Sequence, residues 1–571
     1  MRVGRFACAL GFWVELLIPF LLSGCSQEGP YPQGPIHIVV PNNPGGVVDT
    51  SARLIQPHLQ KYLGVPVVVD IQFDTMAGLS QEEGEASRLE GSEMPVQDLR
   101  DWIALIESAG ELRKVRGADS DVELGAIVDQ YQRRMELPAL LFDEIKGYPK
   151  GFRVLANTLT STRRIALTLG LPAESSKMEL VQAWRQYARQ YPKIPPRWVS
   201  DGPVNENIRK GKDVDLTIFP APKWHEDDGN RYIGTGCLVI QKDPDTAWVN
   251  VGVYRVAVHD QKTAGLYISP GKHGRLIMEK YWARGQDCPI AVSVGQDPTL
   301  FFVAGLEIPY GVSELEVAGG LRGEAVQVIE SEWTGLPVPA TAEIVIEGRI
   351  PRDETREEGP FGEWLGYYAS GRRPAPVIKI DAIRYRNNPI IMGNLPAIPP
   401  NDDTYYRGIL RSAAVWEQLE QSGIPGIKAV WAHESGGGRM LLTIAIQQMY
   451  PGHSKQVGLA AGNCHAGAYA NRIVIVVDDD IDVNNDQQVW WALCSRMDPA
   501  VDIEVVKRCW STSLDPMSYP PEKPVFNNRM VIDACRPWER LQTFPKVAAT
   551  GPELKRKVIE KWRSVLPEIA D

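Results

Sequence analysis

The alternation of hydrophobic and polar residues changes character along the chain. From Asp98 to about Ser200, apolar residues recur at helical spacing, as in DLRDWIALIESAG (98–110). From about 201 to 388, valine, isoleucine and tyrosine alternate with polar residues between Gly, Pro and Asp turns, which is typical of strands. After about 389, apolar runs alternate with helical segments. The pattern predicts an N-terminal α/β domain (98–200), a β-rich domain (201–388) and a C-terminal α/β domain (389–571).

In the predicted C-terminal domain, strands such as PIIMG (389–393) and RIVIVV (472–477) alternate with helices, a pattern that implies an α/β domain with parallel pairing. The acidic run that Asp478 opens follows the second strand, and we expect it in a solvated turn rather than at a metal. The last helix, PELKRKVIEKWRSVL (552–566), collects its apolar residues on one side. Packing on a partner subunit and packing on the same chain are equally compatible with that stripe.

The first 25 residues have the features of a lipoprotein signal. A short basic head, MRVGR, precedes the apolar run ACALGFWVELLIPFLL (7–22), and the run ends at Leu22-Ser23-Gly24-Cys25, which matches a lipobox. Glu15 inside the apolar run departs from the pattern, because a charge in a membrane-inserting segment is costly. We expect residues 1–25 to be a signal-like segment with Cys25 as the lipid acceptor.

Residues 31–72 read as strand, glycine turn, amphipathic helix and strand. This segment resembles the first βαβ unit of a tripartite-tricarboxylate-transporter solute receptor, in which the turn at Pro44-Gly45-Gly46 would bind a carboxylate at a helix N-terminus. Only a fragment, 26–72, is present, and a lone unit cannot bury both faces of its strands. Residues 73–97 are polar and lack a period, so they are expected to be a linker.

Bulk composition excludes some classes of function. The chain has 571 residues with 44% hydrophobic residues, enough for three or four domains with large cores. Its 61 basic and 71 acidic residues give a net charge of −10 and no basic stripe, which argues against a nucleic-acid partner. Eight cysteines occur without a CxxC pair, so free thiols in a reducing compartment are expected rather than zinc or disulfides. This indicates a cytoplasmic location for residues 98–571.

Six polar residues stand inside segments that otherwise read as buried strand or tight turn. They are Asn250, Arg255, His273, Glu314, Glu358 and Glu363. One amide, one imidazole and one carboxylate suit a hard cation such as Mn²⁺ or Mg²⁺ better than Zn²⁺. An arginine with two carboxylates suits proton transfer. Taken singly, each has a structural explanation: a turn histidine, a strand-end cap, an acid in the first turn of a helix, or an exposed salt bridge.

From about Gln97 to the C-terminus, the order of sequence blocks resembles the UbiD family of prenylated-flavin decarboxylases. The blocks that carry the resemblance are DLRDWIALIESAGELRKV (98–115), PALLFDEIKGYP (138–149), NENIRKGKDVDLTIFPAPKWHEDDGNRYIGTG (205–236), AWVNVGVYRVAVHD (247–260), LYISPGKHGR (266–275), LEIPYGVSELEV (306–317), PATAEIVIEGRI (339–350), REEGPFGEW (356–364) and RIVIVVDDDIDV (472–483). The resemblance implies an α/β multidomain fold with a central split β-barrel that binds flavin. It also implies a C-terminal domain that makes oligomer contacts.

The resemblance further implies a cofactor, prenylated FMN, held through a divalent cation, with K⁺ as an additional ion. By position, Asn250, His273 and Glu314 would bind Mn²⁺ or Mg²⁺ together with the cofactor phosphate. Arg255 would pair with Glu358 beside the flavin, and Glu363 would donate a proton to the decarboxylated carbon. Further cofactor contacts carried over are Val253, Tyr254, Lys272, Ala304, Gly305, Leu306 and His465. His465 occupies the place of a phosphate-binding lysine, and Lys272 replaces a glutamine of some members.

The activity that follows is reversible, non-oxidative decarboxylation of an aromatic, heteroaromatic or α,β-unsaturated carboxylic acid. The NVGVYR (250–255) and ISPGKHGR (268–275) motifs look more like those of aryl-acid members. The polyprenyl-hydroxybenzoate step of ubiquinone synthesis is the second candidate. Expected partners are a flavin prenyltransferase as cofactor supplier and further copies of the chain, in a homodimer or homohexamer.

A rival of another class is an exported, lipid-anchored carboxylate-binding protein, based on residues 1–72. General secretion requires an unfolded chain, and no twin-arginine signal is present to export a cofactor-loaded fold. A fused fragment, or a true start at Met76 or Met94, fits the N-terminus better.

Overall fold

The computed structural model describes residues 36–40, 67–71, 96–306, 308–369, 371–520 and 525–569. The chain divides into two compact units, residues 1–88 and 89–571. In the first unit, β1 (Ile36–Val40) and β2 (Val67–Ile71) pair in parallel, which confirms the two strands expected there. The signal-like segment, the glycine turn and the helix expected between the strands lie outside the described residues. Residues 73–95 of the expected linker also lie outside them. No described helix is long and apolar enough to cross a membrane.

The N-terminal part of the second unit is a four-stranded sheet covered by helices. Its strand order is β19-β5-β4-β3, with β3 (Leu112–Arg116), β4 (Ala139–Asp143), β5 (Arg153–Ala156) and β19 (Ile390–Met392). Its helices are α3 (Leu99–Ser108), α4 (Glu123–Gln132), α5 (Thr162–Thr168) and α6 (Lys177–Gln190). The expectation that PIIMG belongs to the C-terminal α/β domain is wrong, because β19 pairs in parallel with β5 in this sheet. An apolar strand pattern does not specify which sheet edge will accept the strand.

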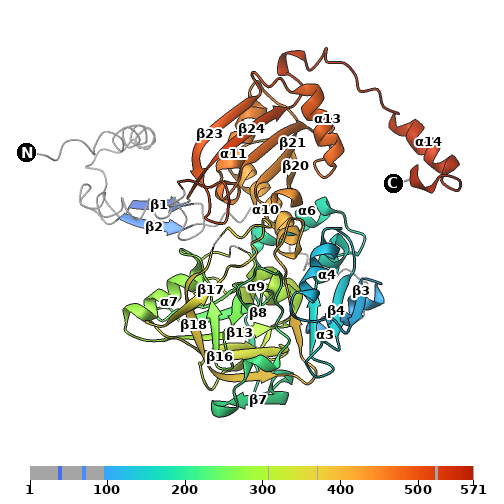
Figure 1. Ribbon diagram of the computed structural model, residues 1–571. Coiled ribbons are helices and arrows are strands. Elements are labelled where there is room, and N and C mark those ends of the chain that lie inside the picture. Colours follow the sequence, from blue (N-terminus) through green and yellow to red (C-terminus); the bar gives the residue numbers. More distant parts are fainter. Residues whose placement is uncertain are drawn as a thin grey trace, which may run out of the picture. The chain divides into compact units, whose positions relative to one another are not determined.

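The central part is a ten-stranded sheet that curls into a half-barrel (Figure 1). Its main path, β10-β9-β13-β16-β18-β12-β11-β8, consists of β8 (Arg231–Gly234), β9 (Leu238–Lys242), β10 (Val249–Gly252), β11 (Val256–Val258), β12 (Thr263–Leu266), β13 (Cys288–Val294), β16 (Ile344–Ile350) and β18 (Arg373–Tyr385). Strands β7 (Asn207–Lys210) and β17 (Thr355–Glu358) pair with β18. The chain between these strands forms α7 (His273–Ala283), α8 (Pro298–Ala304) and α9 (Glu314–Arg322). A small sheet, β15-β14-β6, is built from β6 (Arg197–Trp198), β14 (Gln327–Glu330) and β15 (Pro337–Pro339).

The C-terminal part is a five-stranded sheet of order β20-β21-β22-β24-β23. The strands are β20 (Ile427–Ala432), β21 (Leu441–Ile446), β22 (Ile473–Asp478), β23 (Ile503–Trp510) and β24 (Phe526–Ala534), with helices α10 (Asp402–Gln421), α11 (His453–Asn463), α12 (His465–Ala468) and α13 (Asp486–Arg496). Asp478 does not lie in a solvated turn as expected. It is buried, with Oδ2 at 2.9 Å from Arg496 and 3.0 Å from Arg536. The mixed α/β multidomain fold class is confirmed.

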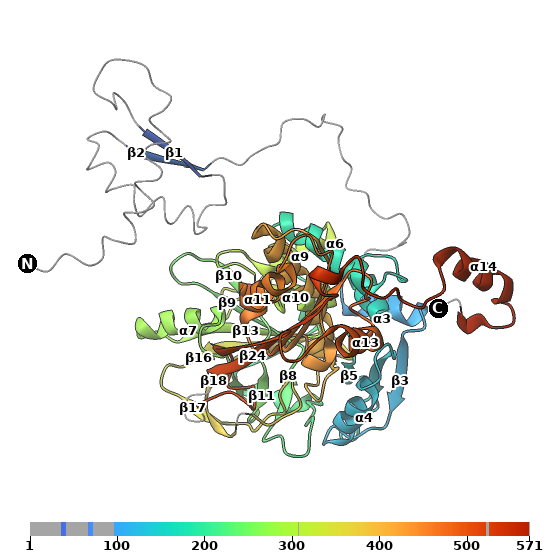
Figure 2. The same cartoon turned by 90° about the horizontal axis from the view of Figure 1, so that it is seen from above.

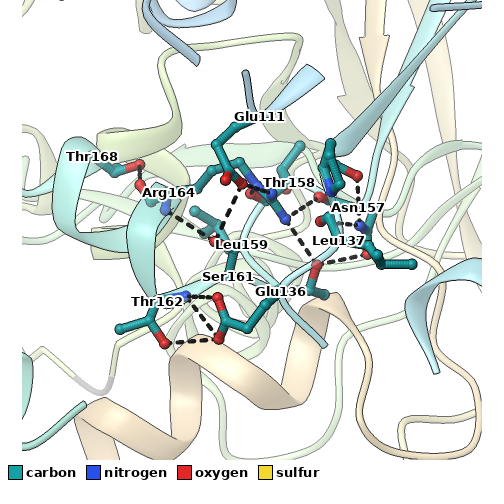
Figure 3. A network of polar contacts seen from close by, with 12 residues as sticks. Glu111, Glu136, Leu137, Asn157, Thr158, Leu159, Ser161, Thr162, Arg164 and Thr168 are labelled. Carbon is teal, nitrogen blue, oxygen red and sulfur yellow. Dashed lines mark hydrogen bonds and ion pairs between the residues drawn. The ribbon is translucent and has the colours of Figure 1, made fainter. Parts of the chain in front are cut away.

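A polar network joins the N-terminal sheet to the start of α10 (Figure 3). At its centre the buried Arg164 contacts Glu111 (2.5 Å) and the carbonyl oxygen of Thr158 (2.8 Å). Beside it, the carboxylate of Asp402 accepts hydrogen bonds from the backbone N–H groups of Thr158 (2.8 Å) and Leu159 (2.6 Å). Burial raises the pKa of Asp402 to about 6. One apolar core continues from this sheet through α10 into the C-terminal sheet.

The last helix, α14 (Pro552–Trp562), extends away from the rest of its unit in both views (Figures 1 and 2). None of its side chains is buried. Leu554, Val558 and Trp562 are exposed along one side, followed by Val565. The apolar stripe predicted from the sequence is therefore uncovered within the described chain.

Candidate active site

The catalytic candidates lie where β11 and β12 adjoin β18 and its partner β17. Arg255 directly precedes β11, Tyr267 directly follows β12, and the N–H of Tyr267 donates to the carbonyl oxygen of Arg255 (3.4 Å). Glu358 ends β17, where it is the cross-strand partner of Arg373 at the start of β18. Because side chains alternate across a sheet, this register brings the four side chains to one face.

Arg255 holds both predicted carboxylates. Its Nε and Nη2 each lie 2.8 Å from an oxygen of Glu358, and its Nη1 lies 2.6 Å from Oε1 of Glu363. All three side chains are at least nine-tenths buried. The bidentate ion pair predicted for Arg255 and Glu358 is therefore present, and a solvated salt bridge is excluded.

Aromatic groups surround this cluster. The hydroxyl of Tyr232 on β8 donates to Oε1 of Glu358 (3.0 Å). The guanidinium carbon of Arg255 lies 4.6 Å from the ring centroid of Tyr267 and 4.8 Å from that of Phe361. The loop that carries Glu363 is fixed because Asp228 accepts the N–H of Gly362 (3.0 Å). The carboxylates are thereby held with little freedom to rotate.

Burial controls the protonation of the cluster. Burial raises the pKa of Glu363, while the nearby charge of Arg255 opposes that rise. Burial by itself would lower the pKa of Arg255, but the charge of Glu363 and the hydrogen bonds that Arg255 donates to Glu358 raise it above its ordinary value. The arginine therefore stays charged, and Glu363 keeps a proton to a higher pH than a solvated glutamate does.

The three predicted metal ligands converge from a strand and two helix N-termini. Asn250 lies on β10, His273 begins α7 and Glu314 begins α9, and both helices contact β10. Asn250 and Glu314 are buried, and Oε2 of Glu314 accepts the N–H of Val251 (2.8 Å). The ring of His273 packs against Trp248, with centroids 5.3 Å apart.

These residues fit a bound cation. Burial raises the pKa of Glu314 to about 8, and within the described residues no cation pairs with it. The amide oxygen of the buried Asn250 is the atom that would face a cation. No cluster of three or more His, Cys, Asp or Glu side chains suited to a metal occurs in the described part of the chain. The predicted set contains only two such side chains, His273 and Glu314, because the amide of Asn250 supplies its third ligand.

The other predicted cofactor contacts divide between two places. Val253 and Leu306 are partly buried where two apolar cores meet, and Tyr254 is close to Gly252. Ala304 ends α8, and the next residue, Gly305, is so close to Tyr406 that a Cβ would stand 2.3 Å from its hydroxyl. Lys272 is exposed immediately before α7. His465 is exposed at the start of α12 in the C-terminal part, with its ring 6.4 Å from that of Trp510.

Four residues near the site were not predicted from the sequence. Tyr232 and Tyr267 sit in strand segments where an aromatic residue is ordinary, so no pattern distinguishes them. Arg373 follows Arg372 in a glycine-bearing turn and reads as a surface charge. Arg407 on α10 donates to the carbonyl oxygen of Gly305 (3.1 Å), a contact between segments 102 residues apart.

Three family models match successive parts of the second unit. They are the N-terminal, Rift-related and C-terminal domains of 3-octaprenyl-4-hydroxybenzoate carboxy-lyase, matched by residues 103–184, 197–399 and 404–534. The chain is 33% identical over 486 residues to the pyrrole-2-carboxylic acid decarboxylase of Pseudomonas aeruginosa, covering 81% of this chain and 97% of the relative. It is also 33% identical over 454 residues to a phenolic acid decarboxylase of a Streptomyces species, covering 78% and 93%.

Two solved structures share the fold. The UbiD-class enzyme HmfF from Pelotomaculum thermopropionicum, in complex with FMN, matches with a TM-score of 0.71 at 29% identity, over 80% of this chain and 98% of that one. The vanillic acid decarboxylase of Sedimentibacter hydroxybenzoicus, in open form, matches with a TM-score of 0.72 at 29% identity, over 83% and 100%. Together with the three family models, these matches establish that the chain belongs to the UbiD family of carboxy-lyases.

Proposed function

We propose that the protein is a reversible, prenylated-FMN-dependent decarboxylase of an aromatic or heteroaromatic carboxylic acid. The observation that carries the proposal is the buried cluster in which Arg255 bridges Glu358 and Glu363. A carboxyl group with a raised pKa, held by an arginine and buried beside aromatic rings, is suited to hold a proton and transfer it.

Loss of CO2 from an sp² carbon leaves an electron pair that no protein side chain can accept, and prenylated FMN would supply the electron sink. The protein would then position the acid and control the proton. Arg255 and Glu358 fix each other bidentately and so orient the third member of the cluster. Glu363 would deliver its proton to the carbon from which CO2 has left, and would recover a proton before the next turnover.

Asn250, His273 and Glu314 would hold Mn²⁺ or Mg²⁺ at the cofactor phosphate, with K⁺ as an additional ion. The buried Glu314, which lacks a cation partner among the described residues, supports this assignment. Two helix N-termini at the same place favour bound negative charge. Residues 253–255 and 304–306 would line the flavin, and Lys272 would add positive charge near it.

A heteroaromatic or phenolic acid is the first choice of substrate, because the similar proteins are named for pyrrole-2-carboxylic, phenolic and vanillic acids. The segment 394–408, which we expect to shape substrate choice, supports a polar aryl acid, since Oδ1 of Asn394 is buried without a partner in the described chain. A 3-polyprenyl-4-hydroxybenzoate is the second choice, supported by the descriptions of the matching family models.

A flavin prenyltransferase would supply the cofactor, and a homodimer or homohexamer is the expected assembly. The uncovered apolar side of α14 supports contact with a second copy of the chain. The six described cysteines are free, which supports a cytoplasmic location. N-terminal mass measurement of the fractionated protein would decide this, because a lipidated Cys25 would instead establish a membrane-anchored protein.

The decisive experiment is co-expression with a flavin prenyltransferase, followed by assay of CO2 release from pyrrole-2-carboxylate and hydroxybenzoates. We expect bound prenylated flavin and turnover of at least one acid. Glu363→Gln should abolish turnover and leave the flavin bound, because it removes the proton while keeping the shape of the side chain. Full activity of this variant would remove Glu363 from the mechanism.

A further inference from the structure

A second arginine lies in the catalytic cluster, and no carboxylate of the described residues pairs with it. Arg373, the first residue of β18, is directly opposite Glu358 of β17. Its guanidinium carbon stands 3.8 Å from the ring centroid of Tyr267, the same ring that Arg255 approaches to 4.6 Å. Two guanidinium groups therefore share one aromatic ring at the site.

One hydrogen-bonding edge of Arg373 lacks a partner within the part of the chain that the structure describes. Its Nε and Nη2 are buried and have no hydrogen-bond partner among the described residues. Within those residues, no carboxylate lies within ion-pair distance of it. In Arg255, the corresponding Nε and Nη2 edge donates both hydrogen bonds to Glu358. Buried charged donors without partners are costly, so their retention indicates a ligand that satisfies them.

The charges of the site indicate the kind of ligand. With both glutamates ionised, Arg255 neutralises only one of them, so without Arg373 a carboxylate substrate would meet a net negative charge. Arg373 restores neutrality. When Glu363 carries the proton that decarboxylation requires, the four groups sum to one positive charge, which matches a monocarboxylate.

We propose that Arg373 binds the carboxylate of the substrate through its Nε and Nη2 edge, and so positions the carboxyl group that leaves as CO2. The inference rests on the proposed function, since it assigns the substrate anchor of that reaction. Arg255 is occupied on all three nitrogens by Glu358 and Glu363, so it cannot take a second carboxylate without releasing one. Arg373 can bind a carboxylate while all contacts among Arg255, Glu358 and Glu363 stay in place.

The test compares charged and neutral ligands on the full-length protein loaded with FMN, which lacks the ring that supplies the electron sink. Binding of pyrrole-2-carboxylate and 4-hydroxybenzoate, and of their carboxamides, is measured by calorimetry. Wild-type protein should prefer each acid over its amide. Arg373→Met should weaken binding of the acids at least about 30-fold, the equivalent of about 2 kcal/mol, and leave the amides unchanged. Arg373→Lys should give intermediate affinity, because it keeps the charge and loses the two-donor edge.

Arg352→Met is the matched control, because Arg352 is 59% exposed and, among the described residues, pairs only with the adjacent Asp353. It should bind every ligand as the wild type does. Melting temperatures of all variants establish that they are folded.

Three results would overturn the proposal. The first is a wild type that does not prefer acids over amides, and the second is an unchanged preference in Arg373→Met. The third is that Arg373→Met loses affinity for FMN but keeps its preference for acids. The last would assign Arg373 to the cofactor phosphate. The proposed function fails separately. If prenylated-flavin protein releases no CO2 while the Arg373-dependent preference persists, the reaction assignment is wrong and the carboxylate site stands. If CO2 is released and Arg373→Met leaves KM unchanged, only the anchor is wrong.

Discussion

Gly437 lies directly against the indole ring of Trp364, the residue that follows the proposed proton donor. A Cβ on Gly437 would stand 2.4 Å from Cζ3 of Trp364, and the backbone φ of Gly437 is +63°. Nδ2 of Asn401, the N-cap of α10, also donates to the carbonyl oxygen of Trp364 (3.1 Å). The C-terminal part of the fold therefore holds the loop that carries Glu363.

Gly437→Ala should displace that loop, because the methyl group collides with the indole and the residue is strained at positive φ. We expect kcat to fall at least about tenfold, since a small misplacement of a catalytic group is costly, while flavin content stays the same. Gly423→Ala is the control: Gly423 has a φ of +75°, but a Cβ there meets nothing within 4 Å. Equal kcat for the wild type and Gly437→Ala would show that the contact does not position Glu363.

The pH profile should report the protonation of Glu363. Burial raises its pKa, so the protonated form is present below that raised value and is lost as pH rises through it. We expect kcat/KM to have a descending alkaline limb, measured with flavin content held constant. FMN affinity measured over the same range serves as the control for loss of cofactor. Activity that keeps rising through that range would contradict Glu363 as the acid.

Glu314→Gln should lower the affinity of the protein for both the metal ion and the flavin cofactor. The variant removes the only negatively charged member of the ligand set and keeps the size of the side chain. We expect Mn²⁺ affinity to fall at least about tenfold, and flavin to be lost on desalting. These quantities are measured by metal analysis and flavin absorbance. Glu316→Gln, two residues along the same helix, should behave as the wild type. Retention of metal by Glu314→Gln would place the cation elsewhere.

Arg164→Met should destabilise the protein rather than alter its chemistry. Arg164 is fully buried, and its removal leaves Glu111 and the carbonyl oxygens of Asn157 and Thr158 without their donor (Figure 3). Breaking a buried ion pair in this way costs about 3–5 kcal/mol. The measurement is urea or thermal unfolding, with Arg163→Met as the exposed neighbour on the same helix. Equal stability of the two variants would contradict a supporting role for this network.

The sequence identified residues whose chemistry conflicts with their surroundings. Arg255 and Glu363 stand out because apolar strands and glycine turns rarely carry charges, and the structure brings both together. Positions that depend on pairing between distant segments could not be inferred in this way. Arg373 has an ordinary turn sequence, and only its register opposite Glu358 places it in the cluster.

The same limit applies to contacts between domains. Gly437 sits in a glycine-rich loop whose sequence carries no sign that an indole packs on it. The sequence predicts a solvated position for Asp478, because nothing near it in the sequence indicates its ion-pair partner. That partner, Arg496, lies on a helix 18 residues away. Residue type and local period predict elements and candidate chemistry, whereas partners across the fold depend on how the elements pack.

The position of β19 has a consequence for synthesis on the ribosome. The first sheet receives this strand only after the whole half-barrel has been translated, since β5 ends at Ala156 and its partner begins at Ile390. Until then, the nascent chain presents an unpaired strand edge that can recruit other extended chains. A fragment ending near residue 200 should therefore aggregate when expressed alone, and chaperone capacity should govern the yield of the full-length protein.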